Sequence, residues 1–206
     1  MSIDIRPVSC GMIQENAYIV SLEGRDDCVV VDPGDEYPRL KEAVGERRVA
    51  AILLTHGHFD HIMAAGPMAG EYAAPVYAAE ADFEMLNDAG INGYGDLMGV
   101  SRADWPPITA LPYGDRVSAA GMDFAILPTP GHSKGSVCLY LENEGALFSG
   151  DTLFRAGYGR LDLHGGSMND MISSLKRLFQ LPGEVRVYPG HGGETTIGEE
   201  RVRYRL

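Results

Sequence analysis

The chain lacks a stretch long and apolar enough to cross a membrane, and its first residues do not resemble a secretion signal. No run approaches the roughly 18 apolar residues of a transmembrane helix. The segment from Met1 to Arg6 has neither the basic part nor the apolar part of a signal peptide. We therefore expect a cytoplasmic protein without a membrane partner.

Basic residues are outnumbered by acidic ones. The 206 residues include 17 lysines and arginines and 29 aspartates and glutamates, which gives a formal net charge of −12. Proteins that bind nucleic acids attract the phosphates with basic patches, so this charge argues against a nucleic-acid partner. A small-molecule substrate is the partner that we expect, and no feature of the sequence indicates an oligomeric state.

Cysteine is rare and occurs an odd number of times, as Cys10, Cys28 and Cys138. The last two lie in apolar runs, where a cysteine usually acts as a small hydrophobic residue. We expect all three to be structural.

What the sequence does have is a concentration of metal-ligand residues in one short segment. Residues 55–61 read THGHFDH and follow five apolar residues, a pattern typical of a loop at the end of a buried strand. His56 and His58 are two residues apart, so in extended backbone they point to the same side and can reach one ion. Asp60 and His61 then face a second position. Protonated imidazoles this close would repel each other, and a metal ion relieves that repulsion.

Three further residues of ligand type follow apolar runs elsewhere in the chain. His132 and His191 each come after a Pro-Gly pair, and Asp151 comes after Ser-Gly. A zinc ion takes about four ligands, so the segment 55–61 cannot complete two sites by itself. We expect these strand ends to meet at one edge of the fold.

Four blocks of the sequence, in this order and spacing, resemble one family of metalloenzymes. They are THGHFDH (55–61), TPGHSKGSVCLYL (129–141), FSGDTLF (148–154) and VYPGHGGETTIGEER (187–201). The chain resembles the metallo-β-lactamase superfamily, and within it the short glyoxalase II-like hydrolases related to hydroxyacylglutathione hydrolase. The resemblance covers nearly the whole chain.

The resemblance implies a fold, a ligand set and cofactors. The fold is of the α+β class, an αββα four-layer sandwich of two mixed β-sheets with outer helices, formed as a single domain over 1–206. One metal is implied to bind His56, His58 and His132, the other Asp60, His61 and His191, and Asp151 bridges them. Asp60 and Asp151 are the implied catalytic carboxylates. The cofactors are two divalent metal ions, in the first place zinc, with iron or manganese as alternatives.

Hydrophobic periodicity predicts the elements. Strands are expected at 3–5, 17–20, 28–31, 75–78, 116–119, 122–127, 137–141, 146–148 and 185–188, and helices at 36–45, 62–72, 79–87 and 168–181. Residues 90–108 carry the only tryptophan, Trp105, and are expected to form a loop or broken helix near the site. Its apolar residues line the cleft or cover the core, and covering the core is favoured. Asp32 is either a turn former or, as in the family, a buried support of the metal loop.

The chain has no GxSxG motif, so it offers no serine nucleophile of that kind. Two dications that share a hydroxide lower its pKa from about 15.7 towards about 7, and that metal-bound hydroxide can attack a carbonyl. A thioester suits such a site, because a thiol with a pKa near about 8.5 leaves as thiolate without an acid. We therefore expect a metal-dependent hydrolase of thioesters such as S-lactoylglutathione. Asp151 argues against a true β-lactamase, since those enzymes generally place Cys or His at this ligand position.

The resemblance also indicates a substrate-binding segment after the bridging aspartate. Glyoxalase II-like enzymes use a basic residue there, so Arg160, with Tyr158 beside it, is the candidate for binding a substrate carboxylate. The alternative for Arg160 is a surface ion pair with Asp162. The chain has Gly192 and Gly193 where longer glyoxalase II enzymes have a tyrosine, and after them it has a basic tail of Arg201, Arg203 and Arg205 where those enzymes have basic residues in a C-terminal helical domain. The hydrolase class is therefore better supported than the glutathione substrate.

Other functions fit the same ligands. Related persulfide dioxygenases hold a single iron ion with the residues that correspond to His56, His132 and Asp151. A lactonase is a less favoured alternative. A non-enzymatic metal-binding module is also less favoured, because an open glycine-rich cleft exceeds what metal storage needs.

Overall fold

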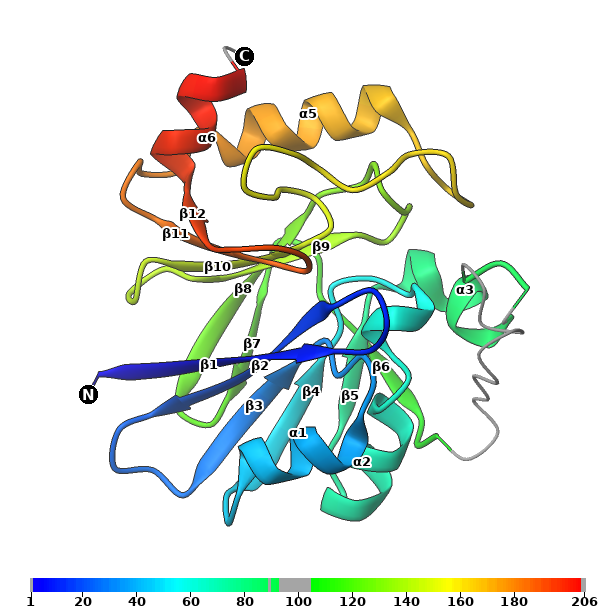
Figure 1. The fold of residues 1–206 in the computed structure, drawn as a ribbon, viewed down its shortest axis with the longest axis vertical. Coiled ribbons are helices and arrows are strands. Elements are labelled where there is room, and N and C mark those ends of the chain that lie inside the picture. The colour runs from blue at the N-terminus through cyan, green and yellow to red at the C-terminus, as the bar shows by residue number, and fades with distance from the viewer. Residues whose placement is uncertain (1, 89, 93–104, 205–206) are drawn as a thin grey trace.

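The computed structural model describes residues 2–88, 90–92 and 105–204, and in it two mixed β-sheets lie face to face (Figure 1). The first sheet contains, in spatial order, β1 (Ile3–Cys10), β2 (Glu15–Leu22), β3 (Asp27–Val31), β4 (Arg48–Leu53), β5 (Val76–Ala78) and β6 (Ile108–Ala110). The second contains β12 (Thr195–Thr196), β11 (Arg186–Pro189), β10 (Ala146–Gly150), β9 (Val137–Leu141), β8 (Met122–Pro128) and β7 (Arg116–Ala119). Each sheet combines parallel and antiparallel pairs.

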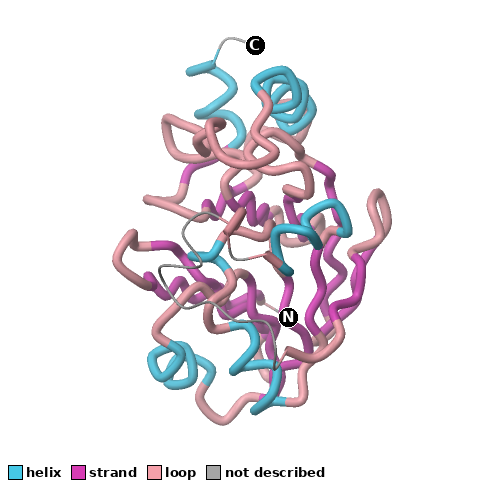
Figure 2. Tube along the Cα trace, turned by 90° about the vertical axis from the view of Figure 1, so that its right-hand side faces the viewer, coloured by secondary structure: helices cyan, strands magenta, loops and turns pink. Residues whose placement is uncertain are grey.

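Helices cover the outer face of each sheet (Figures 1 and 2). The first sheet is covered by α1 (Tyr37–Val44) and α2 (Ala65–Tyr72), and the second by α5 (Met168–Leu178) and α6 (Ile197–Tyr204). The short helix α3 (Phe83–Asn87) and two 3₁₀ turns, Phe59–His61 and Glu80–Asp82, lie in the connections. The predicted α+β four-layer sandwich is confirmed. Within the described residues, no helix has the length and apolar character needed to span a membrane.

The central strands are buried on both faces, and their alternating residues feed different apolar layers. In β3, Cys28 and Val30 pack towards α1 and α2, while Val29 and Val31 pack between the sheets. Side chains that are apolar on both sides of a strand explain why continuous apolar runs, rather than strict alternation, mark these strands in the sequence.

The three cysteines are free and buried, in agreement with their predicted structural role. Burial raises the pKa of Cys138 to about 12, and burial raises the pKa values of Cys10 and Cys28 to about 11. These thiols stay protonated at neutral pH, so none of them is a ready nucleophile.

The strands predicted at 116–119 and 122–127 pair as a hairpin across Ala120 and Gly121, with Ala119 opposite Met122. Both turn residues have positive φ, 48° and 74°, as a tight two-residue hairpin requires. The strands predicted at 116–119 and 137–141 have the observed bounds, and the helices predicted at 36–45, 62–72 and 168–181 were too long. The strands predicted at 3–5 and 17–20 were too short. β1 extends to Cys10 although its outer positions are polar, since backbone pairing with β2 continues along its whole length.

Trp105 packs on the helical side of the first sheet, against Gly66 of α2. A side chain at position 66 would collide with the indole ring, so glycine is required for this approach. Trp105 thus covers the core, as favoured from the sequence. Of the segment 90–108, residues 93–104 lie outside the described part of the chain.

Candidate metal centre

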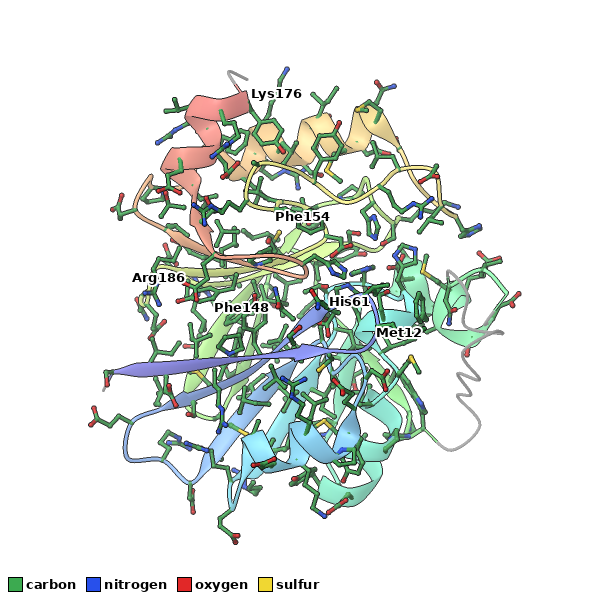
Figure 3. All side chains as sticks on the ribbon, in the orientation of Figure 1. Met12, His61, Phe148, Phe154, Lys176 and Arg186 are labelled. Atoms are coloured by element: carbon green, nitrogen blue, oxygen red, sulfur yellow. The ribbon has the colours of Figure 1, made fainter. Side chains whose placement is uncertain are left out.

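The predicted ligand residues come together at one edge of the sandwich, where strands of both sheets end. The segment 55–61 follows β4, and the loop between β8 and β9 carries His132. Asp151 follows β10, and His191 follows β11. Figure 3 shows His61 at these strand ends, in the region where the loops of the two halves meet.

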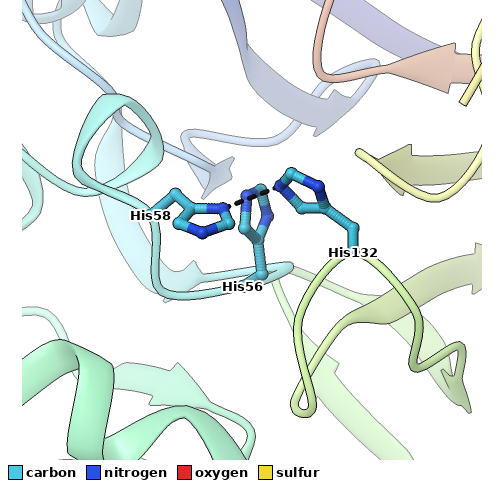
Figure 4. Close-up of side chains that lie close together, drawn as sticks. All are labelled: His56, His58 and His132. Atoms are coloured by element: carbon cyan, nitrogen blue, oxygen red, sulfur yellow. Dashed lines mark hydrogen bonds between the residues drawn. The ribbon is translucent and has the colours of Figure 1, made fainter. Parts of the chain in front are cut away.

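The first group consists of His56, His58 and His132, all of them buried (Figure 4). One ligand atom of each lies within 4.8 Å of the others. His58 Nδ1 and His132 Nε2 are 2.7 Å apart, and Figure 4 shows the three rings turned towards a common point. These imidazoles are placed to bind one ion together.

The second group consists of Asp60, His61 and His191. Asp60 Oδ2 lies 3.4 Å from His61 Nε2 and 3.2 Å from His191 Nε2. Asp151 lies between the two groups, because its Oδ1 is 3.4 Å from His61 Nε2 and its Oδ2 is 3.5 Å from His132 Nε2. One carboxylate therefore reaches histidines of both groups.

The unpaired atoms of this cluster fit metal ions. Within the described chain, these buried ligand atoms have no hydrogen-bond partner: His56 Nε2, His58 Nε2, His61 Nε2 and Asp151 Oδ1. Burying polar atoms without partners is costly, and coordination to a cation satisfies them. Imidazole and carboxylate are ligands that suit divalent first-row metals.

The charge states of the first group also suit a metal. Burial, with His132 as a further cause, lowers the pKa of His58 to about 3, and burial lowers the pKa of His56 well below its ordinary value. Both imidazoles are neutral at pH 7 and so have a free lone pair. Burial opposes the ionisation of Asp151, but His61 and other neighbouring histidines outweigh it and hold the pKa of this carboxyl well below its usual range.

Hydrogen bonds behind the ligands fix which nitrogen faces the centre. His132 Nδ1 donates to the backbone oxygen of Arg160 over 2.7 Å, which leaves Nε2 as the lone-pair atom. Asp32 accepts from the amide and the hydroxyl of Thr55 and lies 3.0 Å from His61 Nδ1. Asp32 is therefore a buried support of the metal loop rather than only a turn former. The hydroxyl of Thr55 lies 3.0 Å from His56 Nδ1 in turn.

Asp82 is a site residue that the sequence did not reveal. Its buried carboxylate accepts from the amides of Gly57 and Gly135 and from the hydroxyl of Ser133. It thereby ties the loop of His56 and His58 to the loop of His132. In the sequence it falls in the first turn of the helix predicted at 79–87, where an acidic residue is common and indicates no site.

Glu15, at the start of β2, is a second residue that the sequence did not reveal. It is fully buried beside His61, with its Oε1 3.7 Å from His61 Nδ1. No motif marks it, since a single glutamate after a turn normally lies at the surface.

A cleft of about 310 Å³ opens over the centre. Its lining contains ligand residues together with Ile13, Phe59, Phe154, Leu163 and Arg160. Arg160 forms a two-point ion pair with Asp162, with both contacts at 2.7 Å and both side chains more than half exposed.

Tyr158 does not line this cleft. Its side chain packs against the cluster under α5, and its hydroxyl lies 4.0 Å from Met168 Sδ. These contacts hold the ring against the α5 side of the molecule, and a part of Tyr158 in substrate binding stays a prediction.

The model of the metallo-beta-lactamase superfamily matches residues 10–191 of this chain. The chain belongs to that superfamily. Among curated proteins it is similar to "Probable metallo-hydrolase YqgX" of Bacillus subtilis, with 36% identity over 95% of this chain and 93% of the relative. It is also similar to "Hydroxyacylglutathione hydrolase GloC" of Haemophilus influenzae, with 29% identity over 98% of this chain and 95% of the relative.

Solved structures agree with this membership. The BLEG-1 B3 metallo-beta-lactamase has a TM-score of 0.90 and 34% identity, covering 97% of both chains. TTHA1623 in a di-iron-bound form has a TM-score of 0.81 and 40% identity, covering 95% of this chain and 96% of that one. ETHE1 from Myxococcus xanthus has a TM-score of 0.77 and 29% identity, covering 96% and 81%. These relatives confirm the fold and the resemblance to the glyoxalase II-like subgroup.

Proposed function

We propose that the protein is a thioester hydrolase that works with two divalent metal ions. The observation that carries the proposal is the position of Asp151, whose carboxylate lies within 3.8 Å of His61, His132 and His191. A carboxylate shared by two ligand groups suits one binuclear centre better than two unrelated sites.

The ligand count supports this reading. Three histidines and Asp151 give the first position four protein ligands, and Asp60, His61, His191 and Asp151 give the second position four. Zinc prefers about four ligands and expands to five when a reactant binds. Such ions supply a hydroxide nucleophile near neutral pH and polarise the carbonyl that it attacks. We propose zinc, although a similar protein has been solved in a di-iron-bound form.

The residues of the cleft suit a substrate with an apolar part next to the scissile bond. Ile13, Phe59 and Phe154 form apolar walls beside the ligands, and these walls exclude water from the reacting carbonyl. Arg160, at the rim, is the candidate for a substrate carboxylate. We propose a glutathione thioester such as S-lactoylglutathione, with support from the likeness to the Haemophilus hydroxyacylglutathione hydrolase.

Two other activities are compatible with similar structures. The second candidate is the iron-dependent persulfide dioxygenase that the same ligands suit, and the likeness to ETHE1 from Myxococcus xanthus, at 29% identity, is compatible with it. The BLEG-1 structure is described as a B3 metallo-beta-lactamase, which makes a β-lactam the third substrate to test.

The deciding experiment measures turnover by protein reconstituted separately with zinc and with iron. Hydrolysis is assayed with four substrates: S-lactoylglutathione, a short acyl thioester, a lactone and a β-lactam. Dioxygenase activity is assayed as oxygen uptake in the presence of glutathione persulfide. We expect thioester hydrolysis by the zinc form, and we expect His58→Ala to abolish nearly all of it. Oxygen uptake by the iron form without thioester hydrolysis would replace the hydrolase with the dioxygenase.

A further inference from the structure

Glu15 is a fully buried carboxylate whose two oxygens have no hydrogen-bond partner within the described chain. An ionised carboxylate in such a place is costly unless a positive charge lies nearby. By contrast, Asp27 is also buried but contacts two arginines, Arg25 and Arg48, at 2.7 and 2.6 Å. Glu15 has no comparable arginine or lysine contact among the described residues.

Three carboxylates and one histidine act on the Glu15 carboxyl group. Burial raises the pKa of Glu15 well above its ordinary value, His61 opposes this shift, and Asp32, Asp60 and Asp151 add to it. Its Oε1 lies 3.7 Å from His61 Nδ1, on the side of the ring opposite to the ligand atom Nε2. The carboxylate therefore lies directly behind a predicted ligand of the second group.

The backbone connects Glu15 to the other histidine of that group. Glu15 and His191 form an antiparallel bridge, and the amide of Asn16 donates to the oxygen of Gly190 over 2.7 Å. The side chain of Asn16 donates to the oxygens of Pro189 and Gly192. The start of β2 thus holds the turn that carries His191 and also places a carboxylate behind His61.

We propose that Glu15 is a positioning residue of the second metal site. It lies behind His61 together with Asp32, on the side of the ring away from the ion that His61, His191 and Asp60 would bind. The inference rests on the metal centre of the proposed function and is independent of the substrate. Partners behind a ligand histidine typically change metal affinity by about 10- to 100-fold when they are removed.

The test is the conservative variant Glu15→Gln, which keeps the size of the side chain. Zn²⁺ is titrated into metal-free protein in competition with a chromophoric chelator, so that the two affinities are resolved without any substrate. We expect one affinity to fall by about 10- to 100-fold and the other to stay within about twofold. The thermal midpoint of the metal-free variant is expected to be equal to that of the unmodified chain or higher, because a buried amide costs no more than a buried carboxyl group without hydrogen-bond partners.

Asp27→Asn is the matched control, a buried carboxylate at the start of β3 with two arginine partners. It is expected to lower the thermal midpoint of the metal-free protein and to leave both zinc affinities unchanged. Two further backgrounds assign the affected site. After His58→Ala, Glu15→Gln is expected to weaken the ion that remains. After His191→Ala, it is expected to leave the remaining ion unchanged.

Equal weakening of both ions, or no weakening of either, would overturn the proposal. A drop in the metal-free midpoint like that of Asp27→Asn, with both affinities intact, would assign Glu15 to packing alone. Because zinc binding is read directly, a protein that binds two ions but hydrolyses no thioester would contradict the proposed function and leave this inference in place.

Discussion

The two ligand groups differ in what lies behind them. The imidazoles of the first group are backed by neutral groups, the Thr55 hydroxyl behind His56 and the Arg160 carbonyl behind His132. In the second group, His61 is backed by two carboxylates, Asp32 and Glu15. Both groups have hydrogen bonds that exist without metal, but the second also gathers carboxylate charge that an ion would balance.

The pKa values follow the same division. Burial is the main cause that lowers the pKa values of His56 and His58, so these imidazoles are neutral and ready to bind. Burial also disfavours the charged form of His61, but Asp60 and Asp151 outweigh it and raise the pKa of this imidazole well above its ordinary value. In the metal-free protein His61 is therefore protonated, and its positive charge lies beside Asp60 and Asp151. A divalent ion would displace this proton and supply the positive charge in its place.

The largest effect is expected where the two groups meet. Asp151→Ala removes the carboxylate that reaches both, so the bound metal is expected to fall from about two ions per chain to about one. Thioester hydrolysis is expected to fall on the order of a thousandfold or more, because attack and carbonyl polarisation are separated. Elemental analysis after reconstitution with excess metal, joined to single-turnover kinetics, measures both quantities.

A ratio of one ion per chain in the unmodified protein, even under excess metal, would contradict the binuclear reading. Asp162→Ala is the control for a nearby lost carboxylate, since Asp162 lies at the surface and contacts Arg160 rather than a ligand. It is expected to leave the metal content unchanged.

A smaller effect, on the first group and on stability, is expected from Asp82→Ala. Three donors, the amides of Gly57 and Gly135 and the hydroxyl of Ser133, lose a buried acceptor. Each unsatisfied donor costs about 1–3 kcal/mol, and because such losses are not additive we expect roughly 3–5 kcal/mol less stability. Urea unfolding of the metal-free protein measures this loss.

Ser133→Ala is the graded control, because it removes one of the three donors and leaves Asp82 with two. We expect it to cost roughly 1 kcal/mol. If Asp82→Ala were no more costly than Ser133→Ala, Asp82 would not be the tie between the two loops, and the first group would depend on metal as the second does.

The sequence was most informative where chemistry is local. Three histidines and an aspartate within seven residues indicate metal binding whatever the fold, and apolar runs mark the central strands because those strands are buried on both faces. The residues that support the ligands carry no such local mark. Asp82 looks like an acidic residue in the first turn of a helix and Glu15 like a surface residue, and only the folded chain brings them to the site.

One edge of each sheet was also missed from sequence, for a related reason. β6 and β12 are short and are held by backbone pairing, which depends little on side-chain pattern. Helix α6 was not predicted, because much of its surface is polar and only Ile197 and Glu200 are buried. The hydrophobic pattern of a sequence predicts helices and strands that have an apolar face. It misses those that form because they pair with or pack against neighbouring elements.

The smallest effect is expected at Arg160, which lies at the rim of the cleft beside the first group. Its backbone oxygen accepts from His132, and that contact survives any side-chain change. The guanidinium is bound to Asp162 at the surface, where ion pairs contribute little. If it also binds a remote carboxylate equally in ground and transition states, Arg160→Ala raises KM and leaves kcat nearly constant.

We expect this KM increase to be about two- to tenfold for S-lactoylglutathione, because the contact is exposed, and to be absent for a short acyl thioester without carboxylates. Asp162→Ala separates the two roles of the arginine. If Arg160 binds substrate, freeing it from Asp162 lowers the KM for S-lactoylglutathione or leaves it unchanged. If the Arg160–Asp162 ion pair only stabilises the surface loop, Arg160→Ala and Asp162→Ala each change the KM for S-lactoylglutathione and for the short thioester equally. The glutathione assignment then loses its local support. A change in kcat with Arg160→Ala would instead mean that the loop moves and that His132 moves with it, which would show that the first group is less firmly held than its hydrogen bonds indicate.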